Sequence, residues 1–256
     1  MSSTPELQDW QRPYFAQAAD SNLIYFVVYG KRNEEMQIPG VPYRILYMPQ
    51  NLQFTFYDES NEGKETVEQF RTSIFGELLQ EQHPELVDSV NAQTNCFIVQ
   101  VASNDSDKLN DLRVAIGLAT YLLDNGCVAA FDITTRKWWT PQAWRENVFE
   151  PEEFNTFAHI RILAHKQEDG TYWVHTLGMR KFGRPDLSIH QVNDENIPVV
   201  EEMIKRFVNY MALGGNITNG QEIKMKGLPE GMLCERIENL DDPEFGNRYV
   251  EINWPK

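Results

Sequence analysis

Hydrophobic residues recur along the chain at the two spacings that distinguish strands from helices. Short apolar or alternating runs rich in β-branched and aromatic residues predict strands. These runs lie at 23–29, 43–48, 52–57, 96–101, 127–133, 158–166, 172–179, 187–192, 222–226, 232–237 and 249–254. Apolar residues three and four positions apart predict amphipathic helices over 64–82, 108–123 and 197–213. Shorter helical turns are expected near 85–90 and 151–157.

The order of these elements predicts the fold class. Strand, helix, glycine stop and strand over 96–133 form the βαβ pattern, which predicts a parallel strand pair with a right-handed crossover. We therefore expect an α+β fold, a mixed and largely antiparallel sheet with two main amphipathic helices packed on it. Residues 1–91 would form an N-terminal strand–helix extension, packed on a main domain of residues 92–256. No Gly/Ser/Pro linker marks that division, so one continuous globule is favoured.

The clearest hairpin has Asp169-Gly170 between two alternating runs. Asp-Gly is typical of a primed two-residue turn. If these two residues form the loop, Ala164 lies opposite His175 on an apolar face, and His165 takes the other face. A change of one residue in the register would reverse these facing relationships.

A tryptophan cluster follows the strand at 127–133. Thr140 is a good N-cap, and Pro141 is a good first residue of a helix. This assignment puts Trp139 and Trp144 at the two positions of a hydrophobic staple. Packing is therefore the preferred interpretation of the cluster, with a platform for stacking a ligand as the alternative.

Composition bounds the partners of the protein. The chain has 256 residues and a formal net charge of −15, from 38 acidic and 23 basic residues. This charge repels phosphate backbones, so we expect no nucleic-acid partner and consider a basic protein instead. The acids are spread along the chain, which argues against a mimic of DNA. No apolar run has the length of a membrane span, so no membrane role is expected. The sequence does not fix the oligomeric state.

Cysteines and histidines give no sign of a metal centre. Cys96, Cys127 and Cys234 are isolated, so we expect neither a disulfide framework nor a zinc knuckle, but buried thiols in the cytoplasm. His159 and His165 would lie about 20 Å apart along a strand, too far for one ion. The loops that bind dinucleotides and nucleoside triphosphates are missing from the sequence, as is the nucleophile elbow. We expect no metal and no cofactor.

Positive charge concentrates in one stretch of this acidic chain, where Arg180, Lys181 and Arg184 follow Trp173 and His175. Burial would favour the neutral form of His175, which could then act as a base. Arginine suits two-point contact with a carboxylate or phosphate, so this stretch could be an anion-binding loop or a docking surface for an acidic partner. The competing interpretation is structural: a hydrogen-bonded histidine in the core, and cations paired with internal acids.

Two segments carry a likeness to a known family. The first is LRVAIGLATYLLDNGCVAAFDITTRKWWTP, with a helix, a small residue, and a strand that ends before a proline-started helix. The second, HTLGMRKFGRPDLSI, is similar to a Gly-Leu-x-x-Phe-Gly-x-x-Glu pattern, with Met179 in place of Leu and Asp186 in place of Glu. Both resemble a bacterial family catalogued as domain of unknown function 4261, over roughly residues 111–256. The resemblance implies a bacterial α+β domain in which Gly178, Phe182, Gly183 and Asp186 are structural, and it implies no activity.

Two functional hypotheses remain. The first is a non-enzymatic interaction or accessory factor, resembling an immunity protein, that neutralises a basic partner by charge complementarity. The second is a small-anion-binding protein or an enzyme that uses His175, Arg180 and Arg184 in a pocket rimmed by Trp173. Convergence of these side chains in an enclosed pocket would favour the second. A packed His175 and dispersed arginines would favour the first.

Overall fold

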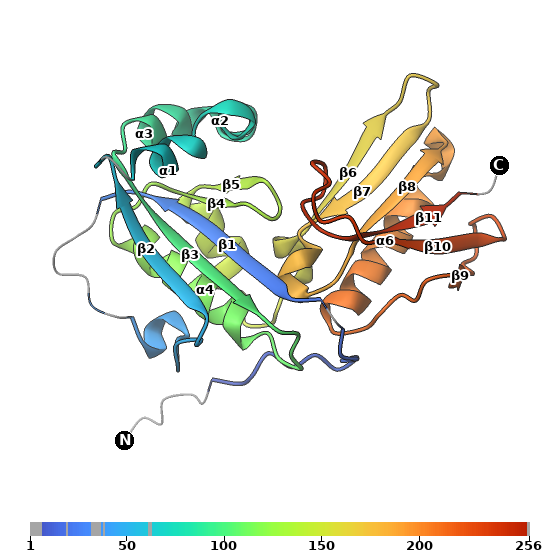
Figure 1. The fold of residues 1–256 in the computed structure, drawn as a ribbon, viewed down its shortest axis with the longest axis horizontal. Helices are drawn as coiled ribbons and strands as arrows, with labels where there is room; N and C mark the ends of the chain where they lie inside the picture. Colours follow the sequence, from blue (N-terminus) through green and yellow to red (C-terminus); the bar gives the residue numbers. More distant parts are fainter. Residues whose placement is uncertain (1–6, 19, 32–36, 38, 61–62, 255–256) are drawn as a thin grey trace. The chain divides into compact units, whose positions relative to one another are not determined.

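The computed structural model of the protein describes residues 7–18, 20–31, 37, 39–60 and 63–254. Contacts divide the chain into two compact units (Figure 1). Unit 1 comprises Met1–Gln11, Ile24–Ser103 and Lys108–Phe154, and unit 2 comprises Arg12–Leu23, Asn104–Asp107 and Asn155–Lys256. Residues on both sides of position 91 belong to unit 1. Whether residues 1–91 form an extension of their own stays a prediction.

Helices and antiparallel-dominated sheets confirm the α+β class, but the structure has two sheets where the sequence predicted one. The strands of unit 1 form a sheet in the order β2-β3-β1-β4-β5. They are β1 (Asn22–Tyr29), β2 (Leu52–Asp58), β3 (Asn95–Ser103), β4 (Ala129–Asp132) and β5 (Lys137–Trp139). β5 is the last strand of this sheet among the described residues, and Thr140 and Pro141 start a helix directly after it.

Helices cover both faces of the first sheet (Figure 1). One face carries α1 (Lys64–Gln69), α2 (Ser73–Gln82) and α3 (Val87–Asn91), and the other carries α4 (Asn110–Asp124) and α5 (Pro141–Trp144). Alternate residues of β1 serve the two faces. Tyr29 packs in the core beneath α1 and α2, whereas Phe26 meets Trp144 edge-on at a centroid distance of 5.1 Å. The continuous apolar run of β1 is therefore buried on both sides, as predicted.

The helix predicted over 64–82 is broken into α1 and α2. Ser73 has a φ of +56°, in the left-handed region that an α-helix cannot contain. The break turns α2 so that Leu79 packs in the same core as Phe70. As a result Ile74, which a straight helix would bury, is 56% exposed.

Two further expectations are wrong. The short strand expected over 43–48 is replaced by a 3-10 turn, Val41–Tyr43, which ends at Arg44 with a φ of +60°. The strands of the βαβ pattern, β3 and β4, are not neighbours, because β1 lies between them. Periodicity showed the strand–helix–strand order, but it could not show that an earlier strand enters the sheet at that place.

The tryptophan staple is confirmed. The hydroxyl of Thr140 accepts a hydrogen bond from the backbone N–H of Ala143 at 3.0 Å, which caps α5. Trp139 and Trp144 pack edge-to-face at a centroid distance of 6.1 Å. Trp144 also donates from Nε1 to the hydroxyl of Thr120 at 2.8 Å, which ties α5 to α4. These contacts favour packing over a stacking platform.

Unit 2 is built on a six-stranded sheet in the order β6-β7-β8-β11-β10-β9. Its strands are β6 (Arg161–Lys166), β7 (Tyr172–Leu177), β8 (Asp186–Val192), β9 (Glu222–Ile223), β10 (Met232–Ile237) and β11 (Tyr249–Asn253). The helix α6 (Ile197–Ala212) buries Val200, Ile204 and Met211 of its predicted stripe. β8 and β11 are parallel neighbours. Short helical turns occur at Pro84–Leu86, Arg145–Phe149, Thr156–His159, Met179–Phe182 and Asp194–Asn196.

Within the described part of the chain, no helix combines the length and apolar character that crossing a bilayer requires.

Replacing Thr140 by Ala should lower the free energy of unfolding by about 1 kcal/mol, because the N–H of Ala143 loses its capping acceptor. Urea denaturation followed by circular dichroism measures this. Thr94→Ala, at an exposed loop position, is the control and should change little. An equal effect in both variants would show that the cap contributes nothing.

Candidate functional site

The chain reversal predicted at Asp169-Gly170 is confirmed, but the loop has three residues and not two. Gly170 donates its N–H to the carbonyl of Gln167 at 3.0 Å, and Gln167 donates to the carbonyl of Thr171 at 2.8 Å. Gly170 has a φ of +86°, the left-handed conformation that the last residue of such a loop requires. The loop therefore runs from Glu168 to Gly170.

This loop shifts the hairpin register by one residue from the predicted one. Leu163, and not Ala164, lies opposite His175. His165 consequently shares a face of the sheet with His175, whereas the prediction had placed them on opposite faces. The extra loop residue is the physical reason for the error.

An aromatic stack forms on that face of unit 2. The indole of Trp173 lies nearly parallel to the ring of His175, with centroids 4.1 Å apart, and to the ring of His190, with centroids 5.2 Å apart. His165 lies 5.3 Å from His175, and Phe245 meets both Trp173 and His175 edge-on. Stacked rings do not direct their nitrogens to a common point. No group of three or more His, Cys, Asp or Glu residues that could hold a metal ion occurs among the described residues.

The stack is packed into the surface of the unit. His175 is 2% exposed, and Trp173 donates from Nε1 to the hydroxyl of Ser188 at 2.9 Å. Glu251 lies on the neighbouring strand β11, beside Ser188. Burial raises the pKa of Glu251, although the hydrogen bond from Ser188 acts in the opposite direction. A packed His175 agrees with the structural interpretation of this residue.

Arg184 is 1% exposed and uses all five N–H donors of its guanidinium group inside unit 2. The acceptors are Oδ2 of Asp105 at 2.9 Å and the carbonyl oxygens of Gly183, Gly214, Gly215 and Ala16 at 2.8, 2.7, 2.9 and 3.0 Å. Because every donor is engaged, an anion could bind Arg184 only by displacing one of these acceptors. The structure therefore does not support Arg184 as an anion-binding or partner-binding residue.

Asp105 lies between Arg184 and a second arginine, Arg12. The Nη1 atom of Arg12 donates to Oδ1 of Asp105 at 2.6 Å, and the backbone N–H of Ala18 donates to Oδ2 at 2.9 Å. The remaining donors of Arg12 reach the carbonyl oxygens of Ser106, Phe182, Met211 and Ala212. We call Arg12, Asp105 and Arg184 the Arg–Asp–Arg cluster. It joins the three chain segments of unit 2, and sequence reasoning missed two of its members.

The other predicted cations are directed elsewhere. Arg180 donates from Nη1 to the carbonyl of Gly246 at 2.7 Å, and burial lowers its pKa, with repulsion from Arg248 adding to the effect. Lys181 is fully buried in the 3-10 turn Met179–Phe182. Arg180 and Arg184 therefore have different internal partners. The structure brings Trp173 and His175 together, but it does not bring the arginines to them as one site.

The 3-10 turn is bounded by Gly178 and Gly183, with φ of +112° and +59°. The backbone at both positions is in the left-handed region, which residues other than glycine rarely adopt. Phe182 is buried within the turn. These positions have structural roles in the turn.

Asp186 is buried at the start of β8 and accepts three hydrogen bonds. The donors are the hydroxyl of Thr176 at 2.9 Å, the backbone N–H of Met179 at 3.2 Å and the side-chain amide of Asn247 at 2.7 Å. Burial raises the pKa of Asp186 to about 7, even though these donors and nearby Lys181 favour the carboxylate.

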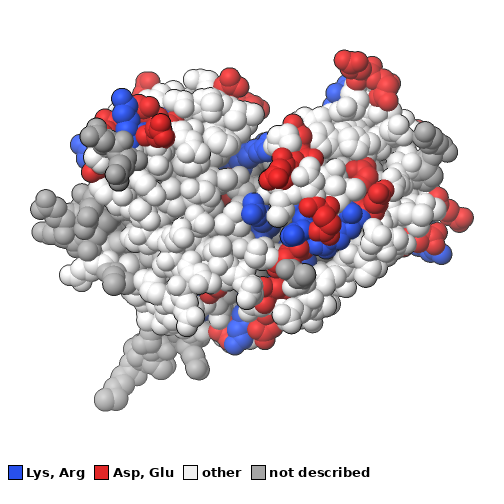
Figure 2. Space-filling model, in the orientation of Figure 1, with Lys and Arg blue, Asp and Glu red and all other residues white. Residues whose placement is uncertain are grey.

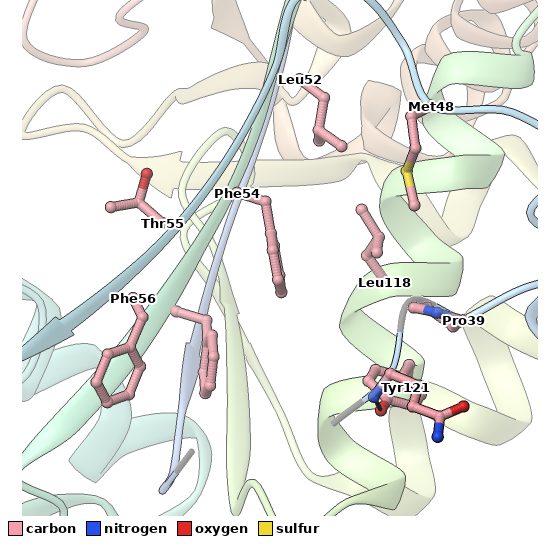
Figure 3. Close-up of a pocket in the computed structure, with 10 residues that line it drawn as sticks. Pro39, Met48, Leu52, Phe54, Thr55, Phe56, Leu118 and Tyr121 are labelled. Carbon is pink, nitrogen blue, oxygen red and sulfur yellow. Dashed lines mark hydrogen bonds between the residues drawn. The ribbon is translucent and has the colours of Figure 1, made fainter. Parts of the chain in front are cut away.

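An apolar pocket in unit 1 was not predicted. It has a volume of about 550 Å³ and lies between β2 and α4. Phe54 points from β2 toward Leu118 of α4, and Tyr121 lies one turn further along that helix (Figure 3). Phe54 also stacks on Phe97 of β3, with centroids 5.9 Å apart. The alternation of β2 predicted the strand, but the apolar face that it predicted to be buried borders a hollow: no residue of β2 is fully buried, and Phe54 is 46% exposed.

Charge on the surface is mixed. In Figure 2, acidic and basic side chains of the visible face occur in common groups with white surface between them. Exposed ion pairs such as Lys205–Glu201 at 2.6 Å and Arg206–Glu202 at 2.8 Å also join opposite charges on the surface of α6. The excess of acid therefore acts through its sum over the chain.

Comparisons with protein-family models, curated proteins and solved structures find no match to this chain. The resemblance to family 4261 therefore stays an expectation. Any functional conclusion must come from the geometry described above.

Replacing Asp105 by Ala should lower the free energy of unfolding by about 3–5 kcal/mol, because two buried guanidinium groups lose their counter-charge. Chemical denaturation measures the change. Asp107→Ala, two residues along the same segment and exposed, is the matched control, with a change within about 0.5 kcal/mol. Similar losses in both variants would mean that the cluster is not a major source of stability.

Asp186 should make the protein less stable as the pH rises from about 4 to about 7. The folded state holds the proton up to a pKa of about 7, whereas the unfolded state releases it near the ordinary value of 3.8, so ionisation in this window favours unfolding. Below this window the contribution of Asp186 is fully present, and above it the contribution is lost.

Asp186→Asn should therefore flatten the decline by up to about 1.4 kcal/mol per pH unit. Unfolding free energies at a series of pH values test this. The exposed Asp241→Asn variant should keep the wild-type slope. An unchanged slope in Asp186→Asn would show that the carboxyl is already ionised in the folded protein below pH 7.

Proposed function

We propose that the protein is a non-enzymatic interaction factor that docks a basic partner through the apolar pocket of unit 1. The observation that carries this proposal is the pocket itself, about 550 Å³ in volume and lined by large apolar side chains. Accessory or immunity-like action would follow from occupying and neutralising such a partner.

The pocket has the character of an anchor site. Phe54, which lines it, is 46% exposed, a high value for a phenylalanine in a strand. Met48, Leu52 and Leu118 provide further apolar lining. Burying a large apolar side chain there would contribute roughly 1.5–3 kcal/mol, which is the size of effect expected at the centre of an interface.

The edge of the sheet offers backbone groups beside the pocket. β2 is the terminal strand in the order β2-β3-β1-β4-β5, so its outer edge has no strand partner among the described residues. An extended segment of a partner could pair with this edge and place every second side chain toward the pocket. We therefore specify the occupant as an extended basic segment that carries a large apolar anchor.

Charge supports a basic partner. The net charge is −15, and the stretch from residue 58 to residue 88, which begins at the end of β2, has nine acidic and two basic residues. The two cations, Lys64 and Arg71, pair with acids of the same stretch, at 3.8 Å from Glu68 and 3.2 Å from Glu59. The helices of this stretch lie on the face of the sheet opposite α4, so its acids add to the long-range attraction of a cationic segment and do not line the pocket.

The alternative, a small-anion-binding protein or an enzyme that uses residues 173–186, has less support. Such a site needs guanidinium donors that are open to a ligand, and those of Arg184 are all engaged. His175 is packed between aromatic rings. We further propose that the protein acts in the cytoplasm, in agreement with its three free and buried cysteines.

Selection of random peptides on the immobilised full chain tests this function. Enriched peptides should combine Lys or Arg with a large apolar residue. Their affinity, measured by fluorescence anisotropy, should fall at least ~10-fold in Phe54→Asp, which places a charge in the pocket. Ile74→Asp, at an exposed apolar position of α2, is the matched control and should bind as the wild type does.

Binding should also weaken as salt is added, because part of the attraction comes from net charge. Enrichment of neutral or acidic peptides would contradict the proposed partner chemistry. Equal affinity for the wild type and Phe54→Asp would contradict the proposed docking surface.

A further inference from the structure

A second pocket of unit 1 contains two arginines. It shares no lining residue with the apolar pocket between β2 and α4. It has a volume of about 620 Å³ and lies between the segment 7–11, the first turn of α4 and the segment 152–154. Arg113 comes from α4, and Arg44 follows the 3-10 turn Val41–Tyr43. Neither arginine belongs to the cationic stretch that the sequence singled out.

Arg113 is buried, and one atom of its guanidinium group, Nε, is buried without a hydrogen-bond partner. It is 2% exposed, yet among the described residues its guanidinium donates one hydrogen bond, from Nη1 to the carbonyl of Gln8. Arg184 is equally buried and has all five donors engaged. A charged group held in this way is costly to the fold, and an anion that accepted its free donors would offset that cost.

Arg44 adds a second positive charge to the same pocket. It is half-buried and donates to the carbonyl oxygens of Pro151 at 2.8 Å and Glu150 at 3.2 Å. Burial lowers the pKa of Arg113; the negative charge of Asp9 opposes this shift, and repulsion from Arg44 adds a smaller lowering effect. The backbone of Arg44 has a φ of +60°, a strained conformation that often marks a functional position.

The other pocket residues indicate the rest of the ligand. Trp10 and Phe154 form an aromatic pair, with centroids 5.2 Å apart, that lines the pocket. Glu152 and Glu153 are exposed residues of the lining, and Asp9 is engaged with Lys108 at 2.6 Å. These acids would repel a doubly charged phosphate more strongly than a carboxylate with a single charge.

We propose that this pocket binds a small aromatic carboxylate, with Arg113 and Arg44 holding the carboxylate and with Trp10 and Phe154 contacting the ring. The planar fork of a guanidinium matches the two oxygens of a carboxylate. The lone carboxylate and the zwitterion of an amino acid share this chemistry. The exposed glutamates would favour the zwitterion if its ammonium reaches them.

Isothermal titration of the full chain with four probes tests the proposal. Phenylacetate should bind saturably, whereas phenethylamine, which has the ring without the carboxylate, and inorganic phosphate should bind at least ~10-fold more weakly. Phenylalanine that binds more tightly than phenylacetate would identify the zwitterion as the ligand type, and weaker binding would identify the lone carboxylate. Failure of both carboxylates to bind, or equal binding of phenethylamine, would overturn the proposal.

Variants separate a ligand-binding role from a structural one. Arg113→Gln and Arg44→Gln should each weaken phenylacetate binding at least ~10-fold, and Arg206→Gln, on the exposed face of α6, should leave it unchanged. Without ligand, Arg113→Gln should keep or raise the melting temperature, because the buried charge has few hydrogen bonds to lose. Two results together would overturn the assignment of the two arginines as ligand-binding residues. They are a marked fall in the melting temperature of Arg113→Gln and unchanged phenylacetate binding in Arg44→Gln.

Discussion

The Arg–Asp–Arg cluster is the interaction on which unit 2 depends. One carboxylate, Asp105, neutralises one of two buried guanidinium groups, which leaves an excess of one positive charge. That excess faces the carbonyl oxygens at the C-terminal end of α6, from Met211 to Gly215, which the two arginines bind. The C-terminal end of a helix carries partial negative charge, so it favours cations at this place. The cluster thereby holds the N-terminal segment, the 104–107 segment and α6 together.

Arg184 and Arg113 show how the same residue type serves different ends. Both are almost completely buried, but Arg184 has a carboxylate and four carbonyl oxygens around it, whereas Arg113 has one carbonyl oxygen. A fully engaged guanidinium stabilises the fold and has nothing left for a ligand. A buried guanidinium with an unpaired donor can still bind an acceptor from a ligand. Burial alone therefore does not distinguish a structural arginine from one that could bind a ligand. The number of its donors that are already hydrogen-bonded does.

Local sequence signals anticipated local structure well. The apolar run of β1, the stripe of α6 and the cap at Thr140 each depend on residues a few positions apart, and the structure confirms them. The register of β6 and β7 was wrong by one residue because Asp-Gly occurs both in two-residue turns and at the end of three-residue loops. Only the hydrogen bond from Gly170 to Gln167 distinguishes the two.

What the sequence could not anticipate depends on residues that are far apart in the chain. Arg184 was singled out from its charge, but its partners Asp105 and Arg12 lie 79 and about 170 residues away, and no periodicity relates them. The insertion of β1 between β3 and β4 is of the same kind. The sequence therefore identified the cations and offered internal pairing as one interpretation, but it could not identify the partners. Both pockets of unit 1 lie where side chains from separate segments leave space between them. The pattern of residues along the sequence does not indicate such spaces.

The interleaved segments also give the two units an order of assembly during translation. Unit 1 is complete in the growing chain once Phe154 has been made, whereas Arg184 and the carbonyl groups that end α6 are made later. Arg12 and Asp105 are therefore made before Arg184 and before the end of α6, with which they form the cluster. The nascent chain would hold these two side chains at the ends of an already folded unit, as tethered docking points for the C-terminal part when it leaves the ribosome.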